Sequence, residues 1–517
     1  MEYRDLFLRV KNGNDVRGAA LAAGDEKRTL APGIVSFIAA AYADFLAARY
    51  GKAVGAIRVG VGHDSRITAP EMKAAAIRGL AAAQVYDCGL ITTPAMFQST
   101  VLPESSFDGA IMLTASHLPF NRNGMKFFTR DGALEGKELA EILEAAAVLA
   151  EKNGRLDEEE LLIAEKLPEA EHVTVFDMKA AYAAHMKEII CREVQADDYE
   201  HPLKGLHITV DAGNGASGFF TTDILEPLGA DTTGSVFLEP DGSFPNHVPN
   251  PENAEAMAAA RQATISAGAD LGVIFDCDGD RAAVVFSDGT EVNRNALIAL
   301  LAVIVAEKHP GSTVVTDSVT SDELAVFLTE EAGLKHLRFK RGYKNVINKG
   351  IELNAAGEEC ELAIETSGHG AFRENYFSDD GAYISVRIIC KMAQLRKEGK
   401  RIESLIEGLK TPAEAAEIRM KIQTDNFREA GLQVLDEFRT FAEKREDFHI
   451  VEPNYEGIRV SFDDPEVKGW MLLRLSLHDP VMPMNVESSD KGGVEVILGR
   501  IHPFFAERTV LKPDRDF

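Results

Sequence analysis

The chain has 517 residues, a formal net charge of −27 at pH 7 and 45% hydrophobic residues. This length exceeds what one hydrophobic core can hold, so we expect several domains. The acidic balance argues against nucleic acid as a partner, because that binding needs a surplus of Lys and Arg facing phosphates. A small anionic ligand is not excluded, because it responds to the local charge of a cleft.

Membrane and cysteine signals are weak. No window approaches about 18 uninterrupted apolar residues, so we predict no membrane span and no membrane partner. The N-terminus mixes both charge signs and lacks the apolar core of a signal peptide, which predicts a cytoplasmic protein. The five cysteines form no CxxC pair and are odd in number, so we expect buried, reduced thiols. No pattern indicates an oligomeric state.

A repeated pattern organises the first four hundred residues. Three short apolar runs end in Gly, Ser or Asp clusters and read as buried strands followed by turns, at 57–66, 207–215 and 313–321. A second apolar run follows each one after a largely helical stretch, at 109–117, 271–280 and 360–370. Alternating strands and helices predict parallel sheets with covered faces. Ligands bind beyond the carboxyl ends of such strands, so we expect three functional loops to face one cleft.

The predicted fold class is therefore α/β. We expect three similar domains with mixed, mostly parallel sheets at 1–172, 173–296 and 297–410. After about residue 410, helical sequence leads into two strand-like stretches, at 456–462 and 469–477. These predict a smaller C-terminal α+β domain at 411–517. The Glu- and Leu-rich run at 143–171 is predicted to be helix and linker.

The first loop with chemistry follows the apolar run at 271–275. Asp276, Asp278 and Asp280 alternate around Gly279, and like charges so close repel unless something compensates them. A hard divalent cation would compensate, and all-oxygen ligands favour Mg²⁺. An EF-hand is excluded, because no Glu follows six residues after the glycine. A solvated acidic turn is the structural alternative.

The second loop follows the run at 109–113 and contains Ser116, His117 and Lys126. We expect the Asn123-Gly124 pair to form a turn that returns Lys126 towards Ser116. A hydroxyl, an imidazole and an amine together suit a nucleophile or phosphate carrier. Alone, a Ser-His pair is more often an ordinary turn. Beside the aspartate loop, a phosphoserine would supply the anionic oxygen that a three-Asp magnesium site lacks.

The third loop offers donors and acceptors to vicinal hydroxyls. Glu365, Ser367 and His369 alternate around Gly368 at the end of the last apolar run. Without its place in the repeat, this pattern would fit a satisfied polar turn equally well.

Together these loops resemble the α-D-phosphohexomutase superfamily, which includes phosphoglucomutases, phosphomannomutases and phosphoglucosamine mutases. The family patterns T-A/G-S-H-N-P…N-G-x-K, D-x-D-G-D-R and E-x-S-G-H match residues 114–126, 276–281 and 365–369. Further similar segments are residues 17–18, 62–66, 241–252 and 339–344. The resemblance spans nearly the whole chain.

The resemblance implies a phosphohexomutase that moves a phosphoryl group between the 1- and 6-positions of a hexose phosphate. Glucose and mannose phosphates are the leading candidates, and a bisphosphorylated sugar is the implied intermediate. Phosphorylated Ser116, Asp276, Asp278 and Asp280 would bind Mg²⁺. The implied groups around the transferred phosphate are His117, Lys126, Arg17 and Arg281. The implied substrate-binding residues are Lys340, Gly342, Glu365, Ser367, His369, Arg474, Ser476 and His478.

The chain departs from the family in its last domain. The family loop R-x-S-G-T-E-P reads Arg474-Leu-Ser-Leu-His-Asp-Pro here, with Leu477 in place of glycine. Leucine cannot adopt the backbone angles open to glycine, so we expect a loop of different shape. Leu118 replaces the family's Asn in the serine loop.

Two alternatives to an active mutase remain. One is a non-catalytic or regulatory relative that binds sugar phosphates with an altered phosphate loop. The other, more distant, is a phosphatase of another α/β superfamily that uses an Asp of the metal loop as its nucleophile. Such a phosphatase needs D-x-D after its first strand and has no use for Ser116 together with 365–369.

Overall fold

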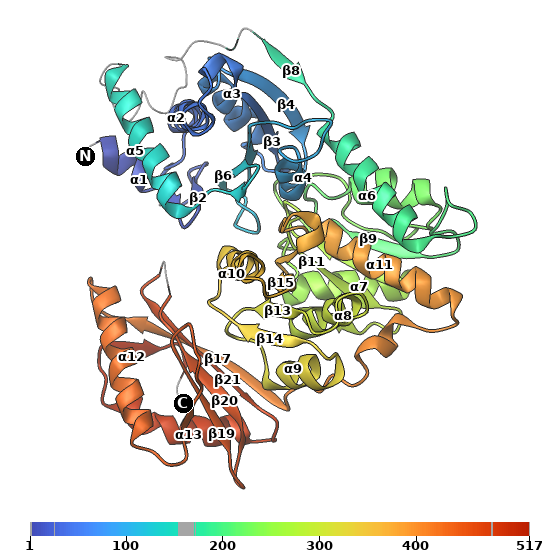
Figure 1. The fold of residues 1–517 in the computed structure, drawn as a ribbon. Coiled ribbons are helices and arrows are strands. Elements are labelled where there is room, and N and C mark those ends of the chain that lie inside the picture. Colours follow the sequence, from blue (N-terminus) through green and yellow to red (C-terminus); the bar gives the residue numbers. More distant parts are fainter. Residues whose placement is uncertain (1–2, 25, 154–169, 171, 477–478, 516–517) are drawn as a thin grey trace. The chain divides into compact units, whose positions relative to one another are not determined.

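The computed structural model describes residues 3–24, 26–153, 170, 172–476 and 479–515 (Figure 1). It divides into two compact units. Unit 1 comprises residues 1–293, 367–371 and 375–402, and unit 2 comprises residues 294–366, 372–374 and 403–517. Each unit is described by itself.

The first sheet of unit 1 runs in the order β1-β2-β6-β5-β3-β4-β8, with β7 paired to β6. Its centre is parallel, since β3 pairs with both β4 and β5, while β6 runs antiparallel to β5. Its strands are β1 (Lys11–Asn12), β2 (Asp15–Ala19), β3 (Arg58–His63), β4 (Gln84–Leu90), β5 (Gly109–Leu113), β6 (Arg122–Thr129), β7 (Gly132–Ala133) and β8 (Val173–Val175).

Helices cover this sheet and form the largest core of unit 1. The core joins side chains of α2, α3 and α5 to those of β3, β5 and β6. Helix α2 starts with Pro32 in its first turn and is capped after Tyr50 by Gly51, whose φ of 62° permits the left-handed cap. The helices of this region are α1 (Tyr3–Leu8), α2 (Pro32–Tyr50), α3 (Ala69–Gly79), α4 (Thr93–Gln98) and α5 (Gly136–Lys152).

Helix α2 is the one described helix that is long and apolar enough to cross a membrane by length and composition. Of its most apolar window, 61% is buried inside the protein. It packs against α3 and α5, as Figure 1 shows in blue and cyan. A buried core helix meets the same length and composition criteria, and this packing accounts for the apolar character of α2.

The second sheet of unit 1 runs in the order β12-β11-β10-β9. Strands β9 and β10 are parallel, and β11 returns antiparallel to β10. Helices α7 and α11 contact this sheet, and α6 packs against α11. The elements are α6 (Met178–Val194), β9 (Ile208–Asp211), α7 (Ala254–Ala267), β10 (Leu271–Phe275), β11 (Ala282–Phe286), β12 (Glu291–Val292) and α11 (Gly381–Lys397).

Unit 2 contains a third α/β segment, in which β13 lies between β14 and β15 and is parallel to both. Helix α10 packs on β13 and β15. The elements are α8 (Arg294–Ala306), β13 (Thr313–Thr316), α9 (Asp322–Val326), β14 (Lys335–Arg338), α10 (Tyr343–Ala355) and β15 (Cys360–Ile364), with β16 (Gly370–Phe372) next in the chain.

The C-terminal part of unit 2 is a six-stranded sheet in the order β18-β19-β20-β21-β17-β22 (Figure 1, orange and red). Every pairing in it is antiparallel. Helices α12 and α13 share an apolar core with the sheet. The elements are β17 (Glu414–Ile422), α12 (Phe427–Glu443), β18 (His449–Ile450), β19 (Ile458–Asp463), β20 (Lys468–Leu473), β21 (Val481–Ser488), α13 (Gly493–Ala506) and β22 (Leu511–Pro513).

The predicted repeat and fold class are confirmed. Each predicted pair of apolar runs forms two adjacent parallel strands: β3 with β5, β9 with β10, and β13 with β15. Strands β5, β10 and β15 are fully buried, as expected of strands covered on both faces. The serine loop and the aspartate loop follow β5 and β10 directly, so the fold brings their chemistry to carboxyl ends of parallel strands.

Candidate active site

The aspartate loop connects β10 to β11. Gly279 has a φ of 72° and lies so close to Ser217 and Thr92 that a Cβ there would meet their side chains at 2.5 and 2.8 Å. Only glycine fits both conditions, and it allows the chain to reverse within six residues. The reversal leaves the carboxylates of Asp276, Asp278 and Asp280 buried together, with ligand oxygens within 4.8 Å of one another.

The donor set of this cluster fits a hard divalent cation. The Oδ1 atoms of Asp278 and Asp280 are buried and accept no hydrogen bond within the part of the chain that the structure describes. Burial and the carboxylates of Asp280 and Asp278 raise the pKa of Asp276 well above its usual range. Buried carboxylate oxygens that repel one another and accept no hydrogen bond are the ligands that Mg²⁺ and similar ions prefer.

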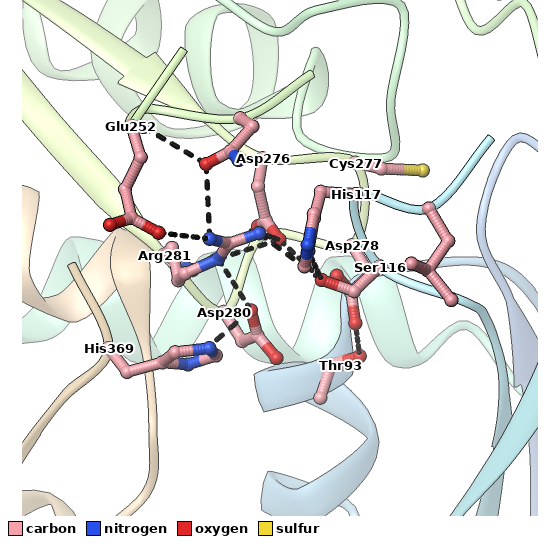
Figure 2. A network of polar contacts seen from close by, with 12 residues as sticks. Thr93, Ser116, His117, Glu252, Asp276, Cys277, Asp278, Asp280, Arg281 and His369 are labelled. Atoms are coloured by element: carbon pink, nitrogen blue, oxygen red, sulfur yellow. Dashed lines mark hydrogen bonds and ion pairs between the residues drawn. The ribbon is translucent and has the colours of Figure 1, made fainter. Parts of the chain in front are cut away.

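Ser116 follows β5 and is only 3% exposed. Its hydroxyl donates to Asp276 Oδ2 at 2.9 Å and lies 3.3 Å from Nδ1 of His117 (Figure 2). Nη2 of Arg281 lies 3.5 Å from the same hydroxyl. The hydroxyl therefore reaches the aspartate loop directly, as the sequence predicts.

Lys126 also reaches this cluster, but by a route other than the predicted one. The prediction of a turn at Asn123-Gly124 is wrong, because both residues lie within β6 and pair with Gly18 and Arg17 of β2. Gly124 serves close packing instead, since a Cβ there would lie 2.2 Å from a carbonyl oxygen of β2. The chain turns between β5 and β6, before residue 122.

Strand β6 places Lys126 beside Met112 of β5, and its amine enters the carboxylate cluster. The amine donates to Asp278 Oδ2 at 2.9 Å and to Asp280 Oδ2. Burial lowers the pKa of Lys126, but Asp278 and Asp280 outweigh burial and leave this pKa well above its ordinary value. Lys126 is therefore a fixed positive charge at neutral pH.

Two arginines contribute positive charge near the serine loop. Arg281 is buried and forms ion pairs with Asp276 at 3.3 Å and with Glu252 at 3.7 Å. Arg17 lies on β2 and pairs with Asp15 at 2.9 Å. His117 as a whole is exposed. Partial desolvation of its ring and the charges of Arg281 and Arg17 lower the pKa of His117, so its imidazole is neutral at pH 7.

His369 lies in unit 1 and belongs to the same cluster. It forms a β-bridge with Arg281, and its Nδ1 lies 3.8 Å from Asp280 Oδ1 and 2.5 Å from Asp379 Oδ2. Burial opposes the imidazolium, but Asp379 and Asp280 raise the pKa of His369 to about 9. Ser367, also in unit 1, is buried.

Sequence reasoning missed several residues around the aspartate loop. Thr93 at the start of α4 donates its hydroxyl to Asp278 Oδ2 at 2.5 Å and its amide to the carbonyl of Asp278 at 2.8 Å. Asn250 accepts from Arg281 at 3.1 Å, and Asp379 orients His369. Thr93 carries no sequence signal for this role, whereas Asn250 lies in the 241–252 segment already singled out.

The remaining predicted binding residues lie in unit 2. Gly342 has a φ of 113° before α10, and its amide donates to Glu365 Oε1 at 2.5 Å. Glu365 is buried, whereas Lys340 is exposed. The predicted third-domain loop and the glutamate of the sugar loop thus meet directly. Glu365 lies in unit 2, whereas Ser367 and His369 lie in unit 1.

The C-terminal loop follows β20. Nε of Arg474 is buried and has no hydrogen-bond partner among the described residues. Burial lowers the pKa of Arg474, partly offset by Glu456. Ser476 pairs with Val481 through its amide at 3.0 Å and accepts from the amide of Asp479 at 3.2 Å. His478 and Leu477 lie outside the described residues.

Comparison with known proteins matches three consecutive segments of the chain to one family. They are described as phosphoglucomutase/phosphomannomutase alpha/beta/alpha domains I, II and III, at residues 9–153, 180–289 and 293–411. A phosphomannomutase/phosphoglucomutase of Pseudomonas syringae pv. tomato is 30% identical over 462 residues, which cover 89% of this chain and 88% of that protein.

Two further comparisons agree. A phosphoglucomutase of Neisseria gonorrhoeae is 28% identical over 96% of both chains. The crystal structure of a phosphoglucomutase/phosphomannomutase family protein from Burkholderia thailandensis superimposes with a TM-score of 0.74 at 26% identity, covering 98% of this chain and 97% of that one. The chain belongs to the phosphoglucomutase/phosphomannomutase family of the α-D-phosphohexomutase superfamily, and it is an isomerase of the phosphohexomutase class.

Proposed function

We propose that this enzyme moves a phosphoryl group between the 1- and 6-positions of glucose or mannose phosphate, with Ser116 as the phosphate carrier. One observation carries the proposal. The Ser116 hydroxyl lies 2.9 Å from Asp276 inside a buried cluster that also contains a lysine and an arginine. A serine at the edge of both a carboxylate cluster and a cationic cluster suits phosphoryl transfer, which depends on positioning and charge neutralisation.

The resident cation of this cluster is proposed to be Mg²⁺. Asp276, Asp278 and Asp280 would hold it together with the phosphate on Ser116. Support comes from the all-carboxylate donor set and from the buried Oδ1 atoms that accept no hydrogen bond among the described residues. When bound, the ion would neutralise charge on the transferred phosphoryl group.

Lys126, Arg281 and Arg17 are proposed to neutralise the equatorial oxygens of the phosphoryl group. Lys126 and Arg281 are buried, so their charges act in a medium of low dielectric constant and are only weakly screened. Arg281 already approaches the Ser116 hydroxyl at 3.5 Å. The same residues would serve both half-reactions, because the phosphoryl group returns to the same serine.

Each half-reaction exchanges one P–O bond for another. The free hydroxyl of the sugar loses its proton as its oxygen bonds phosphorus, and the bond from phosphorus to Ser116 Oγ breaks. The departing Oγ takes up a proton. His117 is neutral and lies 3.3 Å from Oγ, so we assign it to hydrogen bonding and proton handling at this oxygen. The bisphosphorylated sugar then turns around and returns its other phosphate.

Sugar and distal phosphate are assigned to the remaining loops. Glu365, Ser367 and His369 would bind sugar hydroxyls, with Lys340 and Gly342 contacting the substrate beside them. The distal phosphate would be held by Arg474, Ser476 and His478. The buried Nε of Arg474, which has no hydrogen-bond partner among the described residues, supports this assignment.

A non-catalytic relative that only binds sugar phosphates is not favoured. The similar proteins are named as mutases, and the similarity extends over nearly their whole length. The test is turnover of glucose, mannose, glucosamine and N-acetylglucosamine 1-phosphates, with Mg²⁺ and a trace of glucose 1,6-bisphosphate. We expect glucose or mannose 1-phosphate to give the highest kcat/KM. No turnover of any of the four would contradict the mutase proposal.

The C-terminal loop is tested with the best of these substrates. Arg474→Ala should raise KM about tenfold or more, because a charge-assisted hydrogen bond contributes roughly 1.5–3 kcal/mol. Arg419→Ala is the matched control, since Arg419 is an exposed arginine on β17 that pairs with Glu417. An unchanged KM in Arg474→Ala would overturn the assignment of this loop.

A further inference from the structure

Arg66 is almost completely buried, at 1% exposure, and lies behind the serine loop without entering the carboxylate cluster. Its Nη1 donates to the carbonyls of Pro119 at 2.8 Å and Arg122 at 2.9 Å. Its Nη2 donates to the carbonyls of Leu118, at 2.6 Å, and Ser116. Two Nη atoms carry four hydrogens, so the four carbonyls, which lie between residues 116 and 122, use all of them.

The backbone that Arg66 holds is unusual. Ser116 has a φ of 50°, in the left-handed region that costs a non-glycine residue roughly 1–2 kcal/mol. Such a conformation persists only where its surroundings enforce it, and it recurs at functional sites. The carbonyl of Ser116 is held by Arg66, and its amide donates to Thr114 Oγ1 at 2.8 Å.

Thr114 and Asp64 close a ring of interactions. The Thr114 hydroxyl donates to Asp64 Oδ2 at 2.7 Å, and the same oxygen lies 3.2 Å from Nε of Arg66. Asp64 and Thr114 follow β3 and β5, which are parallel neighbours, and the amide of Asp64 donates to the carbonyl of Leu113 at 3.1 Å. The ring is therefore anchored to two parallel strands at the centre of the first sheet.

A segment of the second α/β region covers the ring. The Phe244 ring lies 5.4 Å from the Arg66 guanidinium. Gly242 packs so tightly on residues 65–67 that a Cβ there would meet their backbone at 2.4 to 2.7 Å. Both contacts lie within unit 1, and they help to bury the Arg66 guanidinium.

We propose that Arg66, acting with Asp64 and Thr114, is a positioning residue that holds Ser116 in its left-handed conformation and so aims the hydroxyl at Asp276. The inference rests on the proposed role of Ser116 as phosphate carrier. Every Nη hydrogen of Arg66 already donates to a backbone carbonyl between residues 116 and 122. The guanidinium therefore stabilises the conformation of Ser116 and does not bind the transferred phosphate.

The test compares Arg66→Lys and Thr114→Val with Arg58→Lys in the full-length enzyme. Lysine cannot reach four carbonyls with one nitrogen, and valine keeps the shape of Thr114 without its hydroxyl. Arg58, at the opposite end of β3, contacts Tyr86 and Phe107 and provides the matched control. Three measurements are made: amide exchange of residues 114–122, phosphorylation of Ser116 by glucose 1,6-bisphosphate, and steady-state kinetics, which give kcat and KM.

We expect faster amide exchange confined to residues 114–122 in both variants. We also expect kcat and the Ser116 phosphorylation rate to fall by about ten- to a hundredfold, since displacement of a reacting group by about 1 Å has this effect. KM should stay within about threefold of the value for the unaltered enzyme, because the substitutions displace Ser116 and leave the substrate-binding residues in place. Arg58→Lys should match the unaltered enzyme in all three quantities.

Wild-type exchange and wild-type kcat in Thr114→Val would overturn the inference, and so would a loss confined to KM. Thr114→Val decides the matter if Arg66→Lys does not fold. An unaltered enzyme that neither turns over nor becomes phosphorylated would contradict the proposed function instead. In that case the exchange measurement still decides whether the ring holds the loop.

Discussion

Two single atoms, Oδ1 of Asp278 and Oδ1 of Asp280, explain why the aspartate loop is suited to bind a metal ion. Both are buried and accept no hydrogen bond among the described residues, whereas the Oδ2 atoms of the same carboxylates accept from Lys126. Arg281 and His369 are shared with the further carboxylates of Glu252 and Asp379, so the cations of this cluster compensate its buried aspartates incompletely. An ion that binds the free oxygens would therefore stabilise the folded state.

Metal addition should raise the thermal unfolding midpoint of the EDTA-treated enzyme. At a free Mg²⁺ concentration of 100 Kd the expected gain is about 2.7 kcal/mol. Asp278→Asn should lose most of this gain. Asp288→Asn, which changes an exposed carboxylate beyond the far end of β11, should keep it. A wild-type midpoint that does not respond to Mg²⁺, measured by differential scanning calorimetry, would contradict the metal site.

Glu487 is a second residue with a measurable charge effect. Burial and the Glu323 carboxylate raise the pKa of Glu487 to about 7, and its Oε2 accepts from the indole of Trp470 at 3.1 Å. The folded state therefore holds this proton more tightly than the unfolded chain, whose Glu titrates near about 4.3. The stability contributed by this group is present below about pH 4.3 and is lost as pH rises towards about 7.

Trp470 is the only tryptophan of the chain, so its fluorescence reports this titration. We expect a change in its emission with a midpoint near pH 7. Glu487→Gln should remove the change and should flatten the pH dependence of unfolding in that range. Emission that stays constant from acid to alkaline pH, or an unchanged titration in Glu487→Gln, would show that Glu487 is not the group responsible.

At the scale of elements, the most predictable feature was the run of strands. Runs such as those of β5 and β10 are apolar throughout because both faces are covered, and that pattern is visible in one sequence. Their carboxyl ends then place Ser116 and Asp276 close together. The prediction of a turn at Asn123-Gly124 was wrong, because Gly124 is needed for close packing of strands. The sequence alone does not distinguish such a glycine from one in a turn.

Contacts made between distant segments were not predictable. Thr93 binds Asp278 through the start of α4, and Asp379 fixes His369, yet neither pairing leaves a spacing in the sequence. The contacts of Arg66 were also not predictable. Arg66 lies in a segment that resembles the family, but the carbonyls to which it donates are set by the backbone geometry of the serine loop. Sequence patterns therefore identified the loops, and tertiary packing determined which atoms within them meet.

Glycines in two helices provide a test of packing at this scale. A Cβ at Gly79 of α3 would lie 2.0 Å from the Ser36 carbonyl oxygen of α2, whereas a Cβ at Gly499 of α13 meets nothing within 4 Å. Gly79→Ala should destabilise by about 1–3 kcal/mol through overpacking. Gly499→Ala should stabilise by roughly 0.5–1 kcal/mol through helix propensity. Urea unfolding that gives both substitutions the same sign would contradict this account of the α2–α3 contact.

At the scale of the whole molecule, the net charge of −27 gave little guidance to the ligand. The site depends on local charge: Arg281 approaches the Ser116 hydroxyl, and Lys126 enters the neighbouring carboxylate cluster. The family assignment extends over both compact units, and the proposed chemistry of each loop follows from its place in the repeat. The loop after Arg474 departs from the family pattern in sequence, with Leu477 in place of glycine, and we propose that it holds the distal phosphate.

The central claim is that the phosphoryl group passes through Ser116, and intact-mass measurement tests it most directly. After priming with glucose 1,6-bisphosphate, the purified enzyme should contain a species heavier by one phosphate, which a hexose monophosphate should discharge. Ser116→Ala should lack this species. Ser106→Ala should keep it, because Ser106 has a similar φ of 45° but its hydroxyl donates to the nearby carbonyls of Leu102 and Pro103. No heavier species in the primed enzyme, or its persistence in Ser116→Ala, would contradict the account.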